Sequence, residues 1–493
     1  MCCPRSLAMN LNKPLPVAAR CALYAALLLA LVTLCTRTQA QAPAPQLQSL
    51  LELSPTAPVT RLPAIKAWKL AQGTRVLFVE NHNLAMLDLQ ISFAAGSNQD
   101  GDSPGLAATV LSLFNEGSAL KDANALAEGF DRLGVALGNG ISKEQSFFTL
   151  RSLSAPHIRE PAMHLFTEML ARPGFTVEGQ RRVKNELLTQ LKKDHDAPHA
   201  LARTLIYDEL YPGQAVARSK YGTAESLERI DQAQLVNFYR RAYTAANAQI
   251  VIVGDLTLQQ AQTLSRSLAN ALPAGPALTR PHTVAAPSTR GKTVHIEDEA
   301  SHTLLMMAQN AVPTQHPDWA AIRAGNIMFS HILNGDLRED RSITYGVLSD
   351  IPNAQGPAPW VISLNTPSRY SQGALARIKA LFAQYLEEGP SEIQLNDVKQ
   401  HLLRALPQHT ASNLEMRNEL SIIGRFNQPL TFDYKNRQIQ ALTREQIKAA
   451  MNRHLRADGW VSVTVGPDVV QQPLPDPIAP QTVTAQSCMP ANR

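Results

Sequence analysis

The sequence predicts an α+β protein of two homologous domains, each a mainly antiparallel sheet packed with helices, joined by a linker. A chain of 493 residues is too long for one ordinary hydrophobic core. Hydrophobic residues at 44% and charged residues at 18% are typical of a folded, globular chain. The order of strand and helix patterns also occurs twice, with an offset of roughly 214 residues, as expected after duplication of one unit.

The repeated unit is recognised by its hydrophobic periodicity. Alternating apolar residues predict strands, and apolar residues at helical spacing predict amphipathic helices. The pattern gives a strand, two helices and a final β-rich strand, at 145–153, 156–174, 177–194 and 248–256 in the first half and at 359–367, 373–390, 391–406 and 459–468 in the second. Duplication of one α+β unit explains this agreement most simply.

The N-terminus has the composition of a signal peptide. Basic residues precede the apolar run 21–35, and small residues near Ala40 or Ala42 suit cleavage. This run is shorter than the ~20 apolar residues that span a bilayer. We therefore expect a periplasmic or otherwise exported protein with no stable membrane span once the leader is removed.

Loss of the leader changes the charge and the cysteine content. The formal net charge falls from +5 to +1 (5 − 4) when Arg5, Lys13, Arg20 and Arg37 are removed. So small a charge gives no reason to expect a nucleic-acid partner. Only Cys488 remains of the five cysteines, which excludes an internal disulfide and a cysteine-based metal site. We expect a signal peptide at 1–42, an N-terminal domain at 43–271, a Pro-rich linker at 272–294, a C-terminal domain at 295–468 and a Pro-rich tail at 469–493.

Residues 87–118 read LDLQISFAAGSNQDGDSPGLAATVLSLFNEGS, which is a strand, a polar turn and a helix starting near Leu106. The order of strand, AGS, acidic loop, GLA, helix and G-(S/T) resembles the insulinase/pitrilysin zinc metallopeptidases, which include mitochondrial processing peptidase. The resemblance extends from about residue 60 to residue 468. An ordinary apolar core helix without this ancestry is the alternative interpretation.

In active members of that family, this helix carries the zinc motif H-x-x-E-H. The two His at i and i+4 share one helix face and bind zinc, and the Glu activates the metal-bound water. The resemblance places Ala108 and Ser112 at the His positions and Leu111 at the Glu position. Ala and Leu side chains cannot ligate a metal, and a Ser hydroxyl is a weak zinc ligand. We therefore expect a degenerate motif, with no metal, no cofactor and no catalytic residue in this chain alone.

The family's third zinc ligand, a Glu, falls on the helix at 177–194. Thr189 or Gln190 stands at that position here, and Glu186 lies one turn earlier.

Three other pairs of side chains were considered as metal sites, and each has a more ordinary interpretation. They are His164 with Glu168, His195 with His199, and His295 with His302. The first pair should lie on a helix packed against its sheet. Pro198 should break the helix that would align the second. The third resembles the start of a polar strand.

Residues 337–349, LREDRSITYGVLS, form a second motif. In the C-terminal domain, members of the family have a segment close to LREKRGLTYGVYS. The resemblance implies that Arg338 grips the substrate main chain and that Tyr345 donates a hydrogen bond to the scissile carbonyl as it becomes an oxyanion. The alternative is Arg338 in a surface ion pair and Tyr345 in the core.

The segment before this motif departs from the family. Family members usually have a glycine-rich stretch and Ser-Arg-Leu there, but 326–339 has no glycine cluster and has His331, Ile332 and Leu333 instead. We expect a loop that is shorter or differently shaped.

Two-subunit members of the family place H-x-x-E-H on one chain and the Arg and Tyr on the other, around a shared chamber. The resemblance implies that this chain is the non-catalytic subunit, inactive alone, with zinc in its H-x-x-E-H partner and peptides as substrates. A stand-alone peptide-binding or scaffold protein is the alternative. An active peptidase with unrecognised ligands is a third hypothesis, and it requires about one zinc ion per purified chain.

Overall fold

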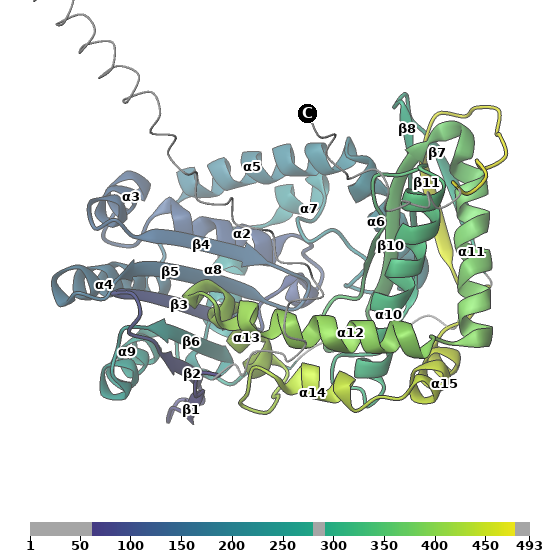
Figure 1. Ribbon diagram of the computed structural model, residues 1–493. Coiled ribbons are helices and arrows are strands. Elements are labelled where there is room, and N and C mark those ends of the chain that lie inside the picture. Colours follow the sequence, from purple (N-terminus) through teal and green to yellow (C-terminus); the bar gives the residue numbers. More distant parts are fainter. Residues whose placement is uncertain (1–61, 280–290, 479–493) are drawn as a thin grey trace, which may run out of the picture. The chain divides into compact units, whose positions relative to one another are not determined.

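The computed structural model describes residues 62–279 and 291–478, in which the elements of the first half recur in the second (Figure 1). The first half contains β1 (Lys66–Lys69), β2 (Arg75–Glu80), β3 (Met86–Phe93), α2 (Leu106–Leu113), α3 (Ala123–Arg132), β4 (Ala136–Ile141), β5 (Ser146–Leu153), α4 (Pro156–Ala171), α5 (Val177–His195), α6 (Pro198–Leu210), α7 (Ala224–Arg229), α8 (Gln232–Ala242), β6 (Ala248–Gly254) and α9 (Leu258–Ala271). The second contains β7 (Thr293–Glu297), β8 (His302–Asn310), α10 (Trp319–Leu333), the π-helix η4 (Asn334–Asp340), β9 (Leu348–Asp350), β10 (Pro359–Pro367), α11 (Ser371–Glu388), α12 (Glu392–Ala405), α13 (Asn413–Arg425), α14 (Tyr434–Gln440), α15 (Arg444–His454) and β11 (Val461–Gly466). The predicted signal peptide, 1–42, lies outside the described residues.

The two sheets have the same topology. The first has the strand order β1-β2-β6-β3-β5-β4 and the second β7-β11-β8-β10-β9, so the second lacks only a counterpart of β1. In each sheet one pair is parallel, β2 with β6 and β7 with β11, and the other pairs are antiparallel. The predicted fold class, two α+β domains with mainly antiparallel sheets, is confirmed.

Strand β3 shows how one strand serves two interfaces. Its odd-numbered residues, Leu87 to Phe93, are buried in the core beneath α2 and α8. Its even-numbered residues Asp88, Gln90 and Ser92 are polar, and they are buried too. Since successive side chains of a strand point to opposite faces, the polar face must also be covered.

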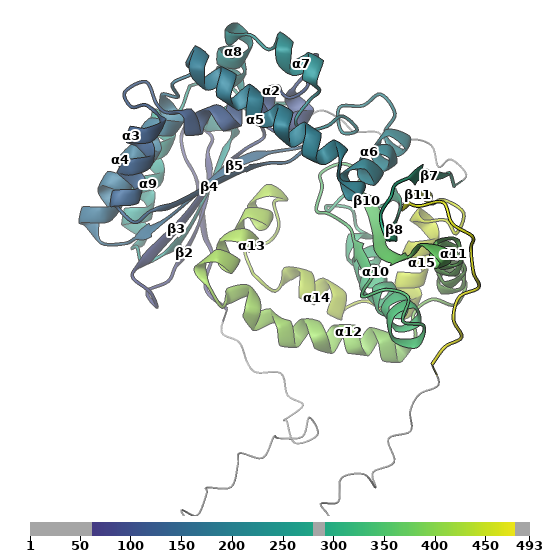
Figure 2. The same ribbon diagram turned by 90° about the horizontal axis from the view of Figure 1, so that it is seen from above.

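A helix from the second half covers that polar face. Helix α13 packs on β2, β3 and β6, where Met416, Leu420 and Ile423 join a core with Leu77 and Val251 (Figure 2). The reverse contact is made by α6, which packs on β8 and β11 of the second sheet. Each half therefore completes one face of the other half's sheet.

Polar contacts accompany this exchange of helices. Gln90 donates to the Ser421 hydroxyl at 2.8 Å, and the Arg75 guanidinium donates to the Gly424 carbonyl at 3.0 Å. Arg425 at the end of α13 forms an ion pair with Glu144, which follows β4. Polar groups on this face of the first sheet, such as Gln90, thus find partners on the second half.

The chain segments around the second domain are ordered against it. Strand β7 includes Thr293 and Val294, the last two residues of the predicted linker. After β11, the chain remains extended along α11, where the Gln472 N–H donates to the Arg369 carbonyl at 2.8 Å. Residues 280–290 and 479–493 lie outside the described part of the chain.

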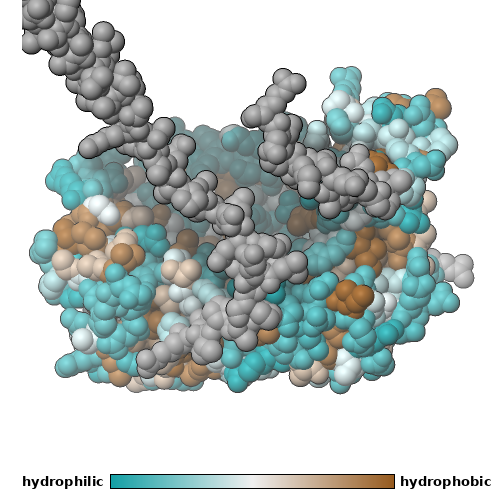
Figure 3. Space-filling view, in the orientation of Figure 1, coloured by the Kyte–Doolittle hydropathy of each residue, from teal (hydrophilic) through white to brown (hydrophobic). Residues whose placement is uncertain are grey.

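The surface is mostly polar on the face that Figure 3 presents, and its hydrophobic residues form separate patches. Within the described residues, every helix is too short or too polar to cross a membrane.

The close approach of α13 to the first sheet predicts a stability defect. A Cβ at Gly424 would meet the side chains of Gln249 and Leu77, the latter at 2.8 Å. We expect Gly424→Val to lower the free energy of unfolding by about 1–3 kcal/mol, the usual cost of overpacking. Asn418→Val places the same side chain on an exposed position of α13 and should change stability by less than ~0.5 kcal/mol. Urea denaturation of both variants measures this, and equal effects would contradict a tight interface.

Candidate functional site

Helix α2 carries the positions that the resemblance assigns to the zinc motif, and it lies in the core of the first domain. Ala108 and Leu111 are 2% and 4% exposed and belong to its main hydrophobic cluster, while Ser112 is half-buried. The helix packs against α5 and α8. These positions therefore provide packing surface, and no described group of three metal-ligating side chains lies at this helix.

The turn before α2 keeps the architecture that the motif requires. Gly105 has a φ of 92°, and a Cβ there would lie 2.7 Å from the Tyr221 carbonyl oxygen. Asp100 accepts hydrogen bonds from the backbone N–H groups of Gly105 and Ala107, both at 2.8 Å. Burial raises the pKa of Asp100 to about 7, although those N–H groups and the cation Lys143 favour its charged form. The helix start is thus fixed by a buried carboxyl group.

The third-ligand window on α5 also lacks a metal ligand directed at α2. The Thr189 hydroxyl donates to the Asn185 carbonyl, and the Gln190 amide donates to Asp194. Glu186 is exposed.

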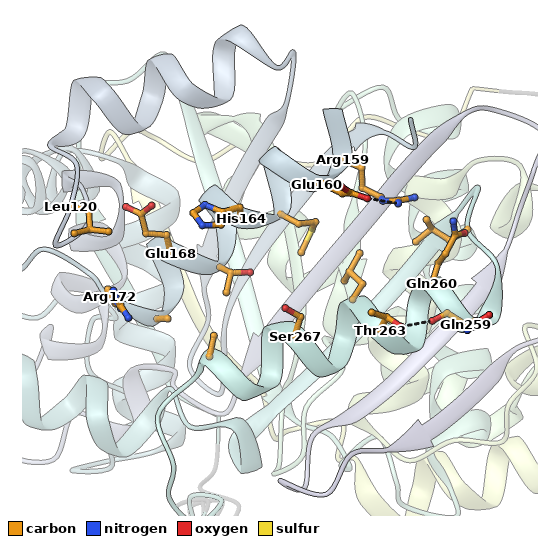
Figure 4. A pocket seen from close by; sticks show the side chains of 16 residues that line it. Leu120, Arg159, Glu160, His164, Glu168, Arg172, Gln259, Gln260, Thr263 and Ser267 are labelled. Carbon is orange, nitrogen blue, oxygen red and sulfur yellow. Dashed lines mark hydrogen bonds and ion pairs between the residues drawn. The ribbon is translucent and has the colours of Figure 1, made fainter. Parts of the chain in front are cut away.

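A cavity of 680 Å³ lies between α4 and α9, and His164 and Glu168 line it one helical turn apart (Figure 4). Glu168 already accepts hydrogen bonds from the Ser118 hydroxyl and from Lys121, so its carboxylate is committed to the turn after α2. The pair is therefore part of the structural frame.

The other two pairs considered as metal sites are His195 with His199 and His295 with His302, and their surroundings are those of ordinary structural residues. Helix α5 ends at His195, and α6 starts at Pro198, as the proline predicted. His295 contacts the Thr464 hydroxyl at 2.9 Å, between strands β7 and β11.

Arg338 and Tyr345 line a pocket of 410 Å³ in the second domain. Arg338 lies on η4, its side chain is 52% exposed, and it forms a loose ion pair with Glu339 at 3.6 Å. Tyr345 is 99% exposed. The alternative interpretation is therefore wrong in placing Tyr345 in the core, but its other part, Arg338 in a surface ion pair, agrees with the structure.

The loop that carries Tyr345 is fixed at both ends. Asn334 donates to the Val347 carbonyl and accepts from the Val347 N–H at 3.0 Å, which ties the loop's end to the start of η4. The Ile343 N–H donates to the Leu337 carbonyl, also at 3.0 Å. Two buried residues of the loop, Ile343 and Val347, flank the exposed Tyr345.

Asp336 anchors the other side of η4. It forms ion pairs with Arg341 at 3.1 Å and with Arg377 of α11 at 2.5 Å. Burial raises the pKa of Asp336, but hydrogen bonds from Arg377 and the positive charges of both arginines outweigh burial and hold it below its ordinary value. Arg338 therefore projects from a segment fixed by charged hydrogen bonds.

The segment before the motif is helical. Residues 326–333 continue α10, and a π-helix follows directly over 334–340. The expected loop is therefore wrong, because α10 runs without a break into η4. π-Helical turns are rare and often occur at functional sites.

The sequence reasoning missed several residues of this region. His302 and Asn365 line the pocket with Arg338 and Tyr345, because β8 and β10 pair beneath the loop. Ser342 also lines it, with a φ of 52° at the position where the family segment has glycine. That substitution was the one signal in the sequence, because glycine adopts positive φ without strain.

The Ser118–Glu168–Lys121 contact predicts a pH-dependent stability. Burial raises the pKa of Glu168, but hydrogen bonds from Lys121 and Ser118 outweigh burial and hold the pKa below 4.5, its ordinary value. A depressed pKa contributes stability above the unfolded value, and the contribution is lost as pH falls through the folded value. We expect Glu168→Gln to lower the free energy of unfolding at pH 7 by about 1–3 kcal/mol.

The difference between wild type and Glu168→Gln should shrink as the pH falls below 4.5. Glu160→Gln, on the same helix but 71% exposed, should change stability by less than ~0.5 kcal/mol. Chemical denaturation at several pH values measures both, and a difference that does not depend on pH would contradict the assignment.

Comparison with known proteins connects this site to a family. Residues 229–402 match the family model described as the peptidase M16 inactive domain. The peptidase M16 inactive domain from Pseudomonas fluorescens superposes with a TM-score of 0.78 at 39% identity, over 83% of this chain and 100% of that one. A non-peptidase homolog, YmxG of Helicobacter pylori, is 24% identical over 374 residues, which are 73% of this chain and 82% of that protein.

A larger protein shares the fold. The periplasmic protease PqqL from Escherichia coli superposes with a TM-score of 0.68 at 16% identity, over 92% of this chain and 52% of that one. The resemblance to the insulinase/pitrilysin peptidases is confirmed. The chain belongs to the peptidase M16 family, as one of its inactive members.

Proposed function

We propose that this chain is the non-catalytic subunit of an exported zinc peptidase and that it pairs with a chain carrying H-x-x-E-H. It contributes Arg338 and Tyr345 to an active site whose zinc and general base belong to the partner. Peptides are the substrates. The observation that carries the proposal is the combination of a 99% exposed Tyr345 with a loop fixed at both ends.

An exposed tyrosine on a fixed loop is suited to transition-state stabilisation. A donor lowers a barrier most when it is already aimed at the place where charge develops. No described residue forms a hydrogen bond with the Tyr345 hydroxyl, so that group is free to bind a substrate oxygen. Arg338, in the same pocket, can bind a peptide carbonyl through its planar guanidinium.

The first domain supports peptide binding by a different route. Strand β4 is an edge strand that pairs only with β5 among the described strands, and Ala136–Asn139 are exposed. A free strand edge offers main-chain donors and acceptors to an extended peptide. Recognition through the main chain suits a peptidase of broad specificity.

Two observations support export. The N-terminal sequence has the composition of a signal peptide, although it lies outside the described residues. The fold is also shared with a periplasmic protease.

The proposal predicts a partner. The chain purified from its native compartment should carry a second chain with H-x-x-E-H in a near-equal amount, as mass spectrometry of the complex would measure. Recovery of this chain alone or as a homodimer would contradict the pairing and favour the peptide-binding scaffold.

In the reconstituted pair, Tyr345→Phe should lower kcat by ~10²-fold or more, the effect of losing one oxyanion donor. KM should change less, because the missing hydrogen bond forms mainly in the transition state. Steady-state hydrolysis of a fluorogenic peptide measures both constants. The matched control is Tyr370→Phe, since Tyr370 also lies beside an arginine, Arg369, in the same domain.

Arg338→Ala tests the second residue in the same assay. Losing a charged hydrogen-bond donor of about 1.5–3 kcal/mol should lower kcat/KM by roughly 10- to 100-fold. Arg369→Ala should leave it unchanged. If neither Arg338→Ala nor Tyr345→Phe affects turnover, the pocket has no part in catalysis.

A further inference from the structure

A group of potential metal ligands lies at one end of α10, away from α2 and from the pocket of Arg338. His316 and Asp318 precede the helix, and His454 is the last residue of α15. One ligand atom from each of the three side chains lies within 4.8 Å of the others, and each residue is partly exposed. Within residues 62–279 and 291–478, this is the one group of three or more such side chains with that geometry.

The orientation of Asp318 is unusual for its position. It is the N-cap residue of α10, where an Asp side chain normally accepts a hydrogen bond from the helix's own backbone. Here the carboxylate makes no cap. Its Oδ2 instead binds Nε2 of His454 at 2.7 Å and the guanidinium of Arg453 at 2.5 Å. The carboxylate is therefore directed at the end of α15.

Asp318 is ready to act as an anion. The Arg453 guanidinium donates a hydrogen bond to its Oδ2 at 2.5 Å, and this positive charge favours the ionised carboxylate. A carboxylate must be ionised before it can coordinate a metal.

The two imidazoles are also placed for coordination. Nδ1 of His316 accepts a hydrogen bond from the Asp318 N–H at 3.1 Å, so this nitrogen carries a lone pair. The rings of His316 and His454 meet edge to face, with centroids 4.9 Å apart. Coordination by Nε2 of His454 would replace its hydrogen bond to Asp318, and the proton on Nε2 would be released to solvent or moved to Nδ1.

We propose that His316, Asp318 and His454 bind one Zn²⁺ ion. Two imidazole nitrogens and one carboxylate oxygen form a mixed ligand set that zinc accepts, with the fourth position left for water. Ca²⁺ and Mg²⁺ prefer oxygen ligands. The 4.8 Å limit on ligand separation exceeds the spacing around a bound ion, so small side-chain rotations bring the three atoms together.

The position of this site suggests a structural role. It joins the start of α10 to the end of α15, two helices that pack together. Helix α10 leads directly into η4, which carries Arg338. A zinc ion here would brace the helix whose other end presents the pocket. The site is independent of the proposed peptidase role and can be tested without a substrate.

The experiment measures zinc binding to the full chain after chelator treatment, by isothermal titration calorimetry and metal analysis. We expect one Zn²⁺ per chain and a rise in Tm on binding. His316→Phe keeps the aromatic packing, and His454→Gln keeps an N–H donor for Asp318. Mutation of a residue that only supports a metal ligand already weakens metal affinity. Removal of the ligand itself, in either variant, should therefore weaken zinc binding by more than ~100-fold.

The matched control is His82→Gln. His82 also lies between two carboxylates, Asp255 at 2.6 Å and Glu80 at 3.1 Å, but its two nitrogens face different partners. This variant should bind zinc as wild type does. Zinc uptake well below one per chain, or uptake that survives His316→Phe and His454→Gln, would overturn the site and leave Asp318–His454 as a hydrogen-bonded tether between helices.

Discussion

The reciprocal packing of α6 and α13 is the constraint on which the rest of the structure depends. Each helix closes the open face of the other half's sheet, so neither sheet is fully buried by its own half. The first sheet places Asp88 and Gln90 under α13, where they meet Arg417 and Ser421. If the two halves separated, this face of the first sheet would be exposed to water with both its apolar and its polar residues. The two halves are therefore coupled in stability, although each repeats the same unit.

The pocket of Arg338 and Tyr345 is held by contacts within the second half. A side chain that stabilises a transition state must keep its position before the substrate arrives. The loop is held locally, by ion pairs of Asp336 and by hydrogen bonds of the Asn334 side-chain amide. The backbone also accepts the positive φ of Ser342, which costs of order 1 kcal/mol in a residue with a Cβ. Strain of this kind persists only when the surroundings fix the loop.

Sequence reasoning succeeded where the signal was local and failed where it was not. The periodicity at 359–367 predicted β10 to the residue, and Pro198 marked the break between α5 and α6. The alternation of apolar and polar residues in β3, by contrast, predicts a strand with one solvent-exposed face. That polar face is buried only because α13 of the other half packs on it. His316 and His454 likewise lie 138 positions apart, and no spacing rule connects them. Contacts made by elements distant in the chain leave no periodic trace.

The two halves repeat one unit but differ at the end of equivalent helices. Helices α2 and α10 occupy equivalent places, each followed along its chain by the strand pair at the far side of its sheet. In the first half, α2 leads into the short 3-10 helix η2 (Phe114–Glu116), and its buried residues belong to the core. In the second half, the equivalent helix continues into η4 and projects Arg338 beyond the core. Two copies of one unit thus came to differ at the end of the same helix.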